Sequence, residues 1–305
     1  MAEDYGLLVE DAVEVPGDEW EEIDVEDTEA DRIARRRDRE FHQFRTRIKD
    51  ADQFKVEQSV FDDATYAAIY RLVQDGYVDA LGGAISTGKE ANVNTALGGE
   101  AAAEALGIDV GNAARGEAAD ERPEVAVKIY RINASDFRDM RGYLEGDPRF
   151  EGVAGNKKAV VLAWTKKEFA NLKRAMKAGV RVPRPIAVER NVLVMEYLGT
   201  EDGRARRLTE VEIQNPQTAY EVVREYMRRL YRAGLVHGDL SEYNMVVHED
   251  ELYVLDLGQA VTVHHPNSRD FLERDCHNVA NFFRRQGLDI TDDDLLAFVT
   301  EDEEG

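Results

Sequence analysis

The spacing of apolar residues predicts ordered structure for most of the chain but not for its N-terminal segment. From Met1 to about Ala30 the chain is dense in Asp and Glu and its few apolar residues are scattered, which is typical of disorder. From Asp63 to Asp75 apolar residues recur at helical intervals, so a packed helix is expected, capped by Gly76. Its expected inward residues are Tyr66, Ile69 and Val73.

Strand-like runs follow this helix. Leu81 to Leu97 predicts a strand, a turn at residues 87–90 and a second strand. Val125 to Tyr130 and Val192 to Gly199 are nearly continuous apolar runs, as expected of buried strands. The stretch 98–123 is rich in Ala, Gly and Glu and lies between two strands, so it is interpreted as a flexible insertion.

Helical spacing returns in the second half of the chain. One helix is expected from about Trp164 to Lys177 and another from Glu221 to Arg232. Two more are expected towards the C-terminus, one starting near Asn267 and one capped by Thr291. The inward residues expected on the first of these helices are Phe169, Leu172 and Met176.

Composition narrows the range of functions. With 305 residues, 43% of them hydrophobic, the chain can form a two-lobed unit or two domains with a cleft between them. Its net charge of -23 repels nucleic acid and anionic membranes overall, and is interpreted as adaptation to a salty cytoplasm. We therefore expect a cytoplasmic protein without a membrane partner. Because Cys276 is the only cysteine, no intramolecular disulfide can form.

One short basic stretch reverses this acidity between residues 32 and 49. It is the one place where so acidic a protein is expected to contact RNA phosphates. The arginines proposed for this contact are Arg35, Arg36, Arg37 and Arg39. The alternative is that the stretch pairs with the acidic segment before it, and the sequence leaves both interpretations open.

The most informative chemistry lies in HGDLSEYN, from His237 to Asn244. Phosphoryl transfer needs one carboxylate that accepts the proton of the attacking hydroxyl, and an amide plus a second carboxylate that hold metal ions. Asp239 and Asn244, five positions apart, fit the base and the first metal ligand. Asp256 fits the second ligand, because it follows the expected return strand of a hairpin that turns at 248–251.

The predicted turn at 87–90 is a candidate phosphate-binding turn, because short side chains let main-chain N–H groups approach phosphate oxygens. Its candidate residues are Ser86, Thr87, Gly88, Lys89 and Glu90. Gly83 to Lys89 also matches most of the P-loop pattern, but Glu90 stands where that pattern needs a hydroxyl. Since a strand and not a helix is expected next, a Walker-type NTPase is disfavoured.

Other candidates lie on the predicted strands and helices. Lys128 is costly to bury without a partner, and ATP phosphates together with Glu168 on the helix from Trp164 would supply one. The run VLVMEYLG predicts a strand that leaves into a connector, where main-chain groups can meet the adenine edge. Its candidate residues are Met195, at the back of the pocket, with Glu196 and Leu198.

Seven sequence motifs, taken in their order along the chain, resemble those of the RIO family of atypical protein kinases, and most of all its type-1 subfamily. They cover the chain from about Phe54 to about Phe298 and are STGKEANV, VAVKIYRI, FRDMRGYLEGDPRF, VLVMEYLG, LVHGDLSEYN, LDLGQAV and FLERDCHNV. The resemblance implies a compact α+β fold with two lobes. The N-lobe would contain an antiparallel sheet plus a helix, and the C-lobe would be a reduced helical lobe without an activation segment. The expected divisions are a flexible segment 1–50, an N-lobe 51–198 with the insertion 98–123, and a C-lobe 199–305.

The resemblance also implies a function. It is that of a serine protein kinase or ATPase, dependent on ATP and Mg²⁺ or Mn²⁺, that acts on the pre-small-subunit ribosomal particle. Asp239 would be the catalytic base, Asn244 and Asp256 the metal ligands, and Lys128 the phosphate-binding lysine paired with Glu168. In this family the carboxylate at the Asp256 position is also a candidate phosphoryl acceptor.

Two other classes stay open at this stage. Small-molecule kinases of the aminoglycoside or choline type use a similar HGDL loop and a later Asp, but they normally carry a larger C-terminal substrate domain than follows Gly258 here. The other class is an assembly factor with little kinase activity, in which nucleotide occupancy times binding to and release from a particle.

Overall fold

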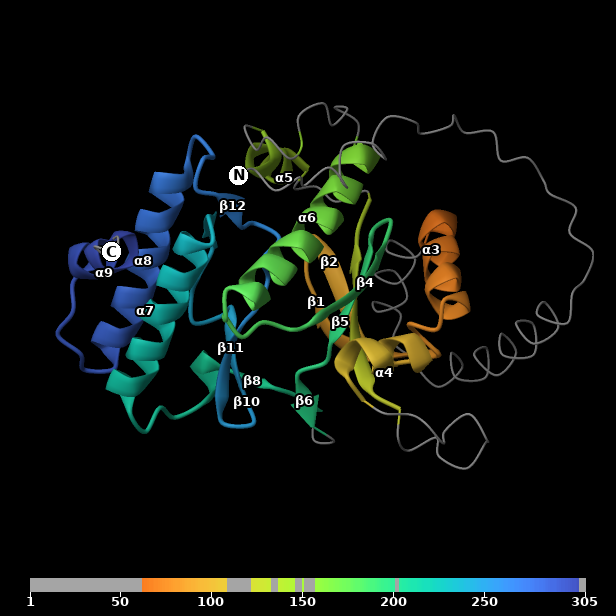
Figure 1. Ribbon diagram of the computed structural model, residues 1–305, viewed down its shortest axis with the longest axis horizontal. Helices are drawn as coiled ribbons and strands as arrows, with labels where there is room; N and C mark the ends of the chain where they lie inside the picture. The colour runs from red at the N-terminus through yellow and green to blue at the C-terminus, as the bar shows by residue number, and fades with distance from the viewer. Residues whose placement is uncertain are drawn as a thin grey trace, which may run out of the picture. The chain divides into compact units, whose positions relative to one another are not determined.

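A five-stranded antiparallel sheet forms the N-terminal lobe of the computed structural model (Figure 1). The strand order is β1-β2-β3-β5-β4, and each neighbouring pair is antiparallel. The strands are β1 Ala80–Thr87, β2 Ala91–Leu97, β3 Glu124–Tyr130, β4 Pro185–Glu189 and β5 Val192–Glu196. The predicted strand, turn and strand between Leu81 and Leu97 are therefore confirmed.

The structure describes residues 62–108, 122–132, 137–145, 150, 157–200 and 203–301, all within the unit Val60–Gly305. The predictions for segment 1–50, including the arginines at 35–37 and 39, lie outside these residues. So does the part of the predicted insertion at 109–121.

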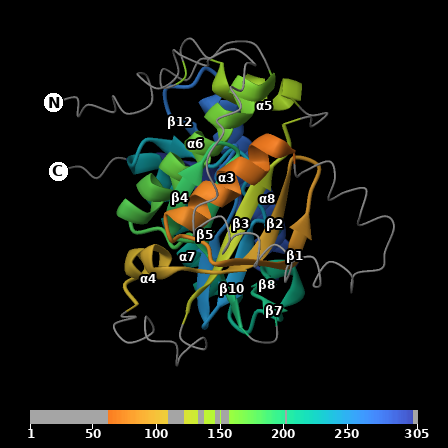
Figure 2. The same cartoon turned by 90° about the vertical axis from the view of Figure 1, so that its right-hand side faces the viewer.

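Four helices accompany the sheet. Helix α3, Asp63–Gln74, packs against β4 and β5, as the turned view in Figure 2 shows. The long helix α6, Lys157–Lys177, packs on β4 and β5 and carries α5, Phe137–Leu144, near its start. Helix α4, Glu100–Leu106, contacts β4. The buried side chains of this lobe include Val125, Val127 and Ile129 from β3.

The second lobe is mainly helical. Its main helices are α7 Pro216–Arg232, α8 Ser268–Arg285 and α9 Asp292–Thr300, and α9 packs on both others (Figure 1). The short hairpin β10 Met245–His248 and β11 Glu251–Val254 lies between the sheet and these helices. The remaining short elements are β6 Gly199–Thr200, β7 Gly203–Arg204, β8 Arg206–Arg207, the 3₁₀ turn η5 Leu208–Glu210, β9 Leu235–Val236 and β12 Val261–Thr262.

The expected C-terminal helices are confirmed, and a side-chain cap explains where α9 begins. Asn267 immediately precedes α8, and Thr291 accepts a hydrogen bond of 3.0 Å from the N–H of Asp294 at the start of α9. The side chain of Asn215 likewise accepts from Thr218 N–H, so α7 begins before the expected Glu221. Helix α6 also begins earlier than expected, at Lys157 instead of Trp164.

Some sequence predictions were wrong. The insertion 98–123 is not flexible throughout, because α4 forms within it and its Ala102 and Ala103 are fully buried. Tyr66 on α3 and Met176 on α6 were expected to face inwards, yet they are 44% and 40% exposed. On α3 the inward positions are instead occupied by smaller residues, Thr65 and Ala68, together with Leu72.

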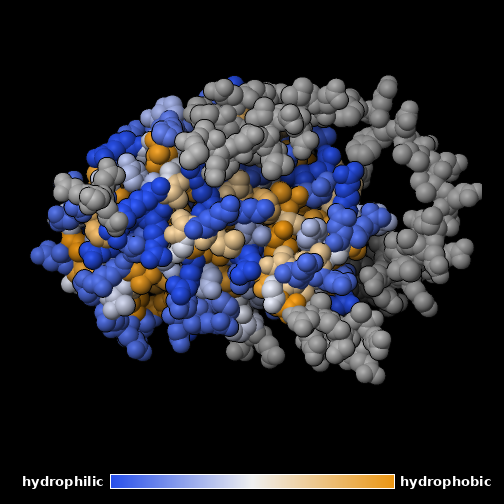
Figure 3. All heavy atoms as spheres, in the orientation of Figure 1, coloured by the Kyte–Doolittle hydropathy of each residue, from blue (hydrophilic) through white to orange (hydrophobic). Residues whose placement is uncertain are grey.

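The described surface is largely hydrophilic on one face (Figure 3). On the face drawn in Figure 3, hydrophilic residues cover much of the described surface and apolar residues form small patches between them. Among the described residues, no helix is both long and apolar enough to cross a membrane.

Candidate active site

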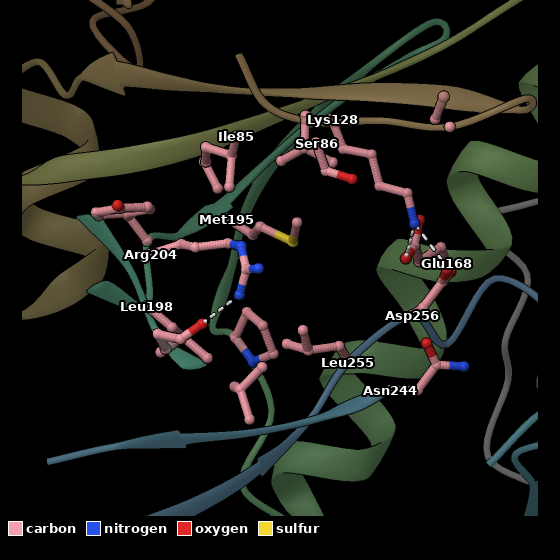
Figure 4. A pocket seen from close by; sticks show the side chains of 18 of the residues that line it. Ile85, Ser86, Lys128, Glu168, Met195, Leu198, Arg204, Asn244, Leu255 and Asp256 are labelled. Atoms are coloured by element: carbon pink, nitrogen blue, oxygen red, sulfur yellow. Dashed lines mark hydrogen bonds and ion pairs between the residues drawn. The ribbon is translucent and has the colours of Figure 1, made fainter. Parts of the chain in front are cut away.

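A cavity of about 460 Å³ opens between the two lobes, lined by the sheet, the connector after β5 and the loops that flank β10 and β11. It brings together most of the residues predicted from sequence (Figure 4). Those that line it are Ser86, Gly88, Lys89, Glu90, Lys128, Glu168, Met195, Glu196, Leu198, Asn244 and Asp256. Two predicted residues, Thr87 and Asp239, are not among the lining residues, and Thr87 is exposed.

The turn between β1 and β2 covers one side of the cavity. It is closed by a hydrogen bond of 2.9 Å from the N–H of Gly88 to the carbonyl of Ala91. Because β2 follows the turn directly, no helix N-terminus points at the phosphate position. The structure therefore excludes a P-loop at this turn, as the position of Glu90 had indicated.

Lys128 lies at the centre of a buried charge network. Its Nζ lies 2.7 Å from Glu168 Oε1 and 2.9 Å from Asp256 Oδ1. Burial alone would lower the pKa of Lys128, but Asp256 and Glu168 outweigh it and raise this pKa well above 10.5. The ammonium therefore stays charged, and it bridges the sheet, α6 and the loop after β11.

Tyr130 joins this network and was missed by the sequence analysis. Its hydroxyl donates a hydrogen bond to Glu168 Oε2, the oxygen that Lys128 does not use. Tyr130 is 1% exposed and lies at the end of β3, two positions after Lys128. Since both oxygens of Glu168 are held by β3, its carboxylate is fixed relative to the sheet.

The catalytic loop holds Asp239 and Asn244 against each other. Asn244 Nδ2 donates to the carbonyl of Asp239 at 2.8 Å and approaches its Oδ2 at 3.4 Å. Burial, together with the charge of Asp256, raises the pKa of the Asp239 carboxyl above 3.8, although His237 and Arg274 oppose this shift. A half-buried carboxylate with a raised pKa suits a general base.

Asp256 has an unusual backbone. Its φ is 60°, in the left-handed region that side chains other than glycine seldom adopt, and such conformations cluster at functional sites. The carboxylate faces the cavity with its side chain 53% exposed, and the charge of Lys128 lowers the pKa of Asp256 below 3.8. The N–H of Leu255 bonds to the carbonyl of Asn244 at 2.8 Å, which ties the two candidate metal ligands together.

Two consecutive residues of α8 hold the catalytic loop. The carboxylate of Asp275 accepts hydrogen bonds from Gly238 N–H at 2.8 Å and from Leu240 N–H at 2.7 Å. Arg274 donates to the carbonyl of Gly238. Asp275 is 1% exposed, and burial raises its pKa to about 6. Asp239 is therefore held through the main chain on both sides.

Helix α6 holds the loop after Asp256 in a similar way. Lys167 Nζ donates to Gly258 O at 3.0 Å, and Asn171 Nδ2 donates to the carbonyls of Leu257 and Ala260 at 3.0 and 2.9 Å. A side chain at Gly258 would collide with Trp164 Nε1, which lies 2.8 Å from the place of its Cβ. The loop is thus packed tightly on α6.

Arg204 lines the cavity from the short strand β7. Figure 4 shows its guanidinium between Ile85, Met195 and Leu198. Both terminal nitrogens lie within 2.8 Å of Glu210 carboxylate oxygens, and the pair lies at the surface with each side chain 38% exposed. Sequence spacing offered no signal for this residue.

Replacing Asp275 by Asn is expected to lower kcat by roughly 10²-fold, because an amide cannot accept both loop N–H groups and Asp239 is then misplaced. The KM for ATP should change little, since Asp275 does not line the nucleotide cavity. Steady-state kinetics measure this split. Asp270→Asn, on the exposed first turn of the same helix, is the matched control. Equal kcat for the two variants would show that the hydrogen bonds from the loop to Asp275 do not contribute to catalysis.

Comparisons with known proteins agree with this geometry. A family model described as RIO domain matches residues 110–296. The RIO-type serine/threonine-protein kinase Rio1 of Haloferax volcanii is 67% identical over 303 residues, which is 99% of this chain and 97% of that protein. The serine/threonine-protein kinase RIO1 of Saccharomyces cerevisiae is 38% identical over 250 residues, 79% of this chain but 52% of the yeast protein.

Solved structures agree on the fold. The crystal structure of the Rio2 kinase-ADP/Mg²⁺-phosphoaspartate complex from Chaetomium thermophilum matches with a TM-score of 0.54 at 21% identity, over 78% of this chain and 67% of that one. The structure of the Rio2 kinase from the same organism matches with a TM-score of 0.56. The predicted α+β kinase-like fold is therefore confirmed.

Proposed function

Because this chain belongs to the RIO family of serine/threonine-protein kinases, of the Rio1 type, we propose that it uses ATP with Mg²⁺ to phosphorylate serine during maturation of the small ribosomal subunit. The observation that carries the proposal is that Lys128, Asn244 and Asp256 line one cleft between the lobes, while Asn244 is hydrogen-bonded to Asp239. Family membership favours a protein substrate over the small-molecule kinases that use a similar loop.

The roles follow from where each group lies. Lys128 is charged and fixed by Glu168, so it is placed to hold nucleotide phosphates. Asp239 lies next to Asn244, which lines the cleft, and would orient the acceptor hydroxyl and take its proton. The turn between β1 and β2 covers the phosphates from above.

The residues present fit a magnesium ion. Asn244 and Asp256 offer an amide oxygen and a carboxylate oxygen, the hard donors that Mg²⁺ prefers, and Mg²⁺ usually takes its other ligands from phosphates and water. Among the described residues there is no cluster of three or more acidic, His or Cys side chains that would form an all-protein site. When bound, the ion would neutralise the charge that develops on the transferred phosphoryl group.

Main-chain hydrogen bonds indicate how adenine is recognised. The N–H of Glu196 already donates to the carbonyl of Arg184 at 2.9 Å, and the carbonyl of Leu198 already accepts from Ala205 N–H at 2.8 Å. We therefore assign the complementary pair, Glu196 C=O and Leu198 N–H, to the adenine edge. Met195 and Leu255 would supply apolar contacts.

The ribosomal role is tested by turnover. ATP hydrolysis and phosphoserine formation by the purified protein should both be measured with and without small-subunit particles. Particles that alter neither activity would speak against this role. The same assay separates a kinase from a nucleotide switch, because a switch would hydrolyse ATP on particles without forming phosphoserine.

If Arg35, Arg36, Arg37 and Arg39 contact ribosomal RNA, their joint replacement by Gln should weaken binding to small-subunit particles. The slope of log affinity against log salt should become shallower by up to roughly three, because fewer counterions are released. Filter binding across a salt titration measures both effects. Replacing Arg141 and Arg269, two exposed arginines on α5 and α8, is the charge control. An unchanged slope would assign the cluster to pairing with the acidic segment.

A further inference from the structure

A second cavity, of about 380 Å³, lies where α5, α6 and the start of α8 meet. Polar and apolar surfaces line it to similar extents, and its aromatic side chains lie together. Tyr143 stacks on Phe271 with ring centroids 4.9 Å apart and meets Trp164 edge-on at 5.9 Å. The remaining lining residues are Glu90, Met140, Gly142, Gln259 and Asn267.

This cavity adjoins the nucleotide cavity. Glu90 and Gln259 line both of them, so the two spaces share a wall at the phosphate end of the cleft.

The second cavity also lies next to the catalytic loop. A Cβ placed on Gly238 would be 3.1 Å from the carbonyl oxygen of Gln259 and 3.7 Å from Cε1 of Tyr143, both of which belong to lining residues. Gly238 directly precedes Asp239 in the chain. Arg274, which donates to the carbonyl of Gly238, also donates to the hydroxyl of Tyr143 at 3.1 Å. The aromatic wall and the catalytic loop are thus held by one arginine.

We propose that this cavity is the acceptor subsite, and that it receives an apolar or aromatic side chain adjacent to the serine that is phosphorylated. The inference rests on the proposed serine kinase function and adds a substrate class to it. Its walls offer stacking surfaces for an aromatic ring, and the amides of Gln259 and Asn267 offer partners for the main chain of an extended peptide.

A peptide bound in this way would take part in phosphoryl transfer from ATP to the serine. The serine Oγ attacks the γ-phosphorus, its proton passes to the carboxylate of Asp239, and the bond between the γ-phosphorus and the bridging oxygen of ADP breaks. A side chain held in the second cavity would fix the serine in line for this attack, which lowers the entropic part of the barrier.

Gly142 makes the proposal testable. It lines the cavity on α5, and a Cβ placed there would meet nothing within 4 Å. Gly142→Phe therefore adds a large side chain at the cavity wall without a clash at its Cβ, while Gly142→Ala is the matched control that adds only a methyl group. The probes are two pentapeptides with one serine, Gly-Phe-Ser-Phe-Gly and Gly-Asn-Ser-Asn-Gly.

For the parent protein and Gly142→Ala, we expect kcat/KM to be higher for the Phe peptide than for the Asn peptide. Gly142→Phe should reduce kcat/KM for the Phe peptide by roughly ten- to hundredfold, the effect of losing one buried aromatic side chain. ATP hydrolysis without peptide should stay the same in all three proteins. Equal rates on both peptides, or an unaffected Gly142→Phe variant, would overturn the proposal.

Binding gives a readout that does not depend on phosphoryl transfer. In a Trp20→Phe background, Trp164 is the only tryptophan and forms part of the cavity wall. The Phe peptide should change its fluorescence saturably, and Gly142→Phe should abolish that change. Saturable binding of the Phe peptide without phosphoryl transfer would uphold the subsite and contradict the kinase function. Phosphoryl transfer without saturable binding at this cavity would uphold the kinase function and contradict the subsite.

Discussion

Replacing Asp239 by Asn is expected to slow phosphoryl transfer by roughly 10²- to 10⁴-fold, the range typical for loss of a general acid or base. ATP affinity should change little, because the residues proposed to hold the phosphates are Lys128 and the β1–β2 turn. Single-turnover rates and nucleotide titration measure the two effects separately. An unchanged rate would remove Asp239 from the mechanism.

The pH profile should agree with this role. A base acts only when ionised, and burial raises the pKa of Asp239 above 3.8. The rate of the parent protein should therefore fall as pH drops through that raised pKa, and the slow Asp239→Asn variant should lack this acid limb. Asp250→Asn is the control, because Asp250 is exposed in the β10–β11 turn and its positive φ suits Asn.

Replacing Asp256 by Ala should reduce the gain in ATP affinity that Mg²⁺ provides by roughly tenfold or more, since loss even of groups that only support metal ligands costs this much. Lys128 keeps its bond to Glu168 in this variant, so ATP affinity without metal should be largely retained. Titration of ATP with Mg²⁺ and with a chelator gives the two values.

Asp239→Asn serves as the comparison for Asp256→Ala, because it should keep the full effect of Mg²⁺ while losing the rate. If Mg²⁺ raised ATP affinity equally in the parent protein and in Asp256→Ala, the assignment of Asp256 as a metal ligand would be wrong. A weaker effect in Asp239→Asn would shift that assignment towards Asp239.

The residues at the centre of the site were predictable because they lie close together in sequence. Asp239 and Asn244 are five positions apart in one loop, and the hairpin that brings Asp256 back to them is short and has a clear strand pattern. Lys128 and Glu168 were also expected as a pair, and they lie 2.7 Å apart. A buried charged or metal-binding side chain needs a partner of complementary chemistry, and this requirement limited which residues could belong to the site.

The supporting residues were not predicted, because their contacts join distant parts of the chain. Asp275 meets Gly238 across 37 positions, and Lys167 meets Gly258 across 91. Asp275 does interrupt a helix stripe that includes Leu272 and Cys276, and a carboxylate at the edge of such a stripe is a usable signal. Tyr130 is the last residue of an apolar strand, where an aromatic residue is more often plain core.

The errors in the helices share one physical cause. Hydropathy gives weight to large side chains, whereas close packing against a sheet also selects small ones. Thr65, Ala68 and Ala102 are fully buried, and Thr65 bonds to Asn191 in the interior. For the same reason the alanine-rich sequence of α4 resembled a linker.

The central claim is that this cleft transfers phosphate from ATP to a protein serine. Its most direct test is to incubate the purified protein with labelled ATP and Mg²⁺ at high salt and to map the modified residue. The account predicts an acid-stable phosphoserine in the parent protein that is absent from Asp239→Asn. A label found only on Asp256 and released by hydroxylamine, or equal serine labelling in both proteins, would contradict it.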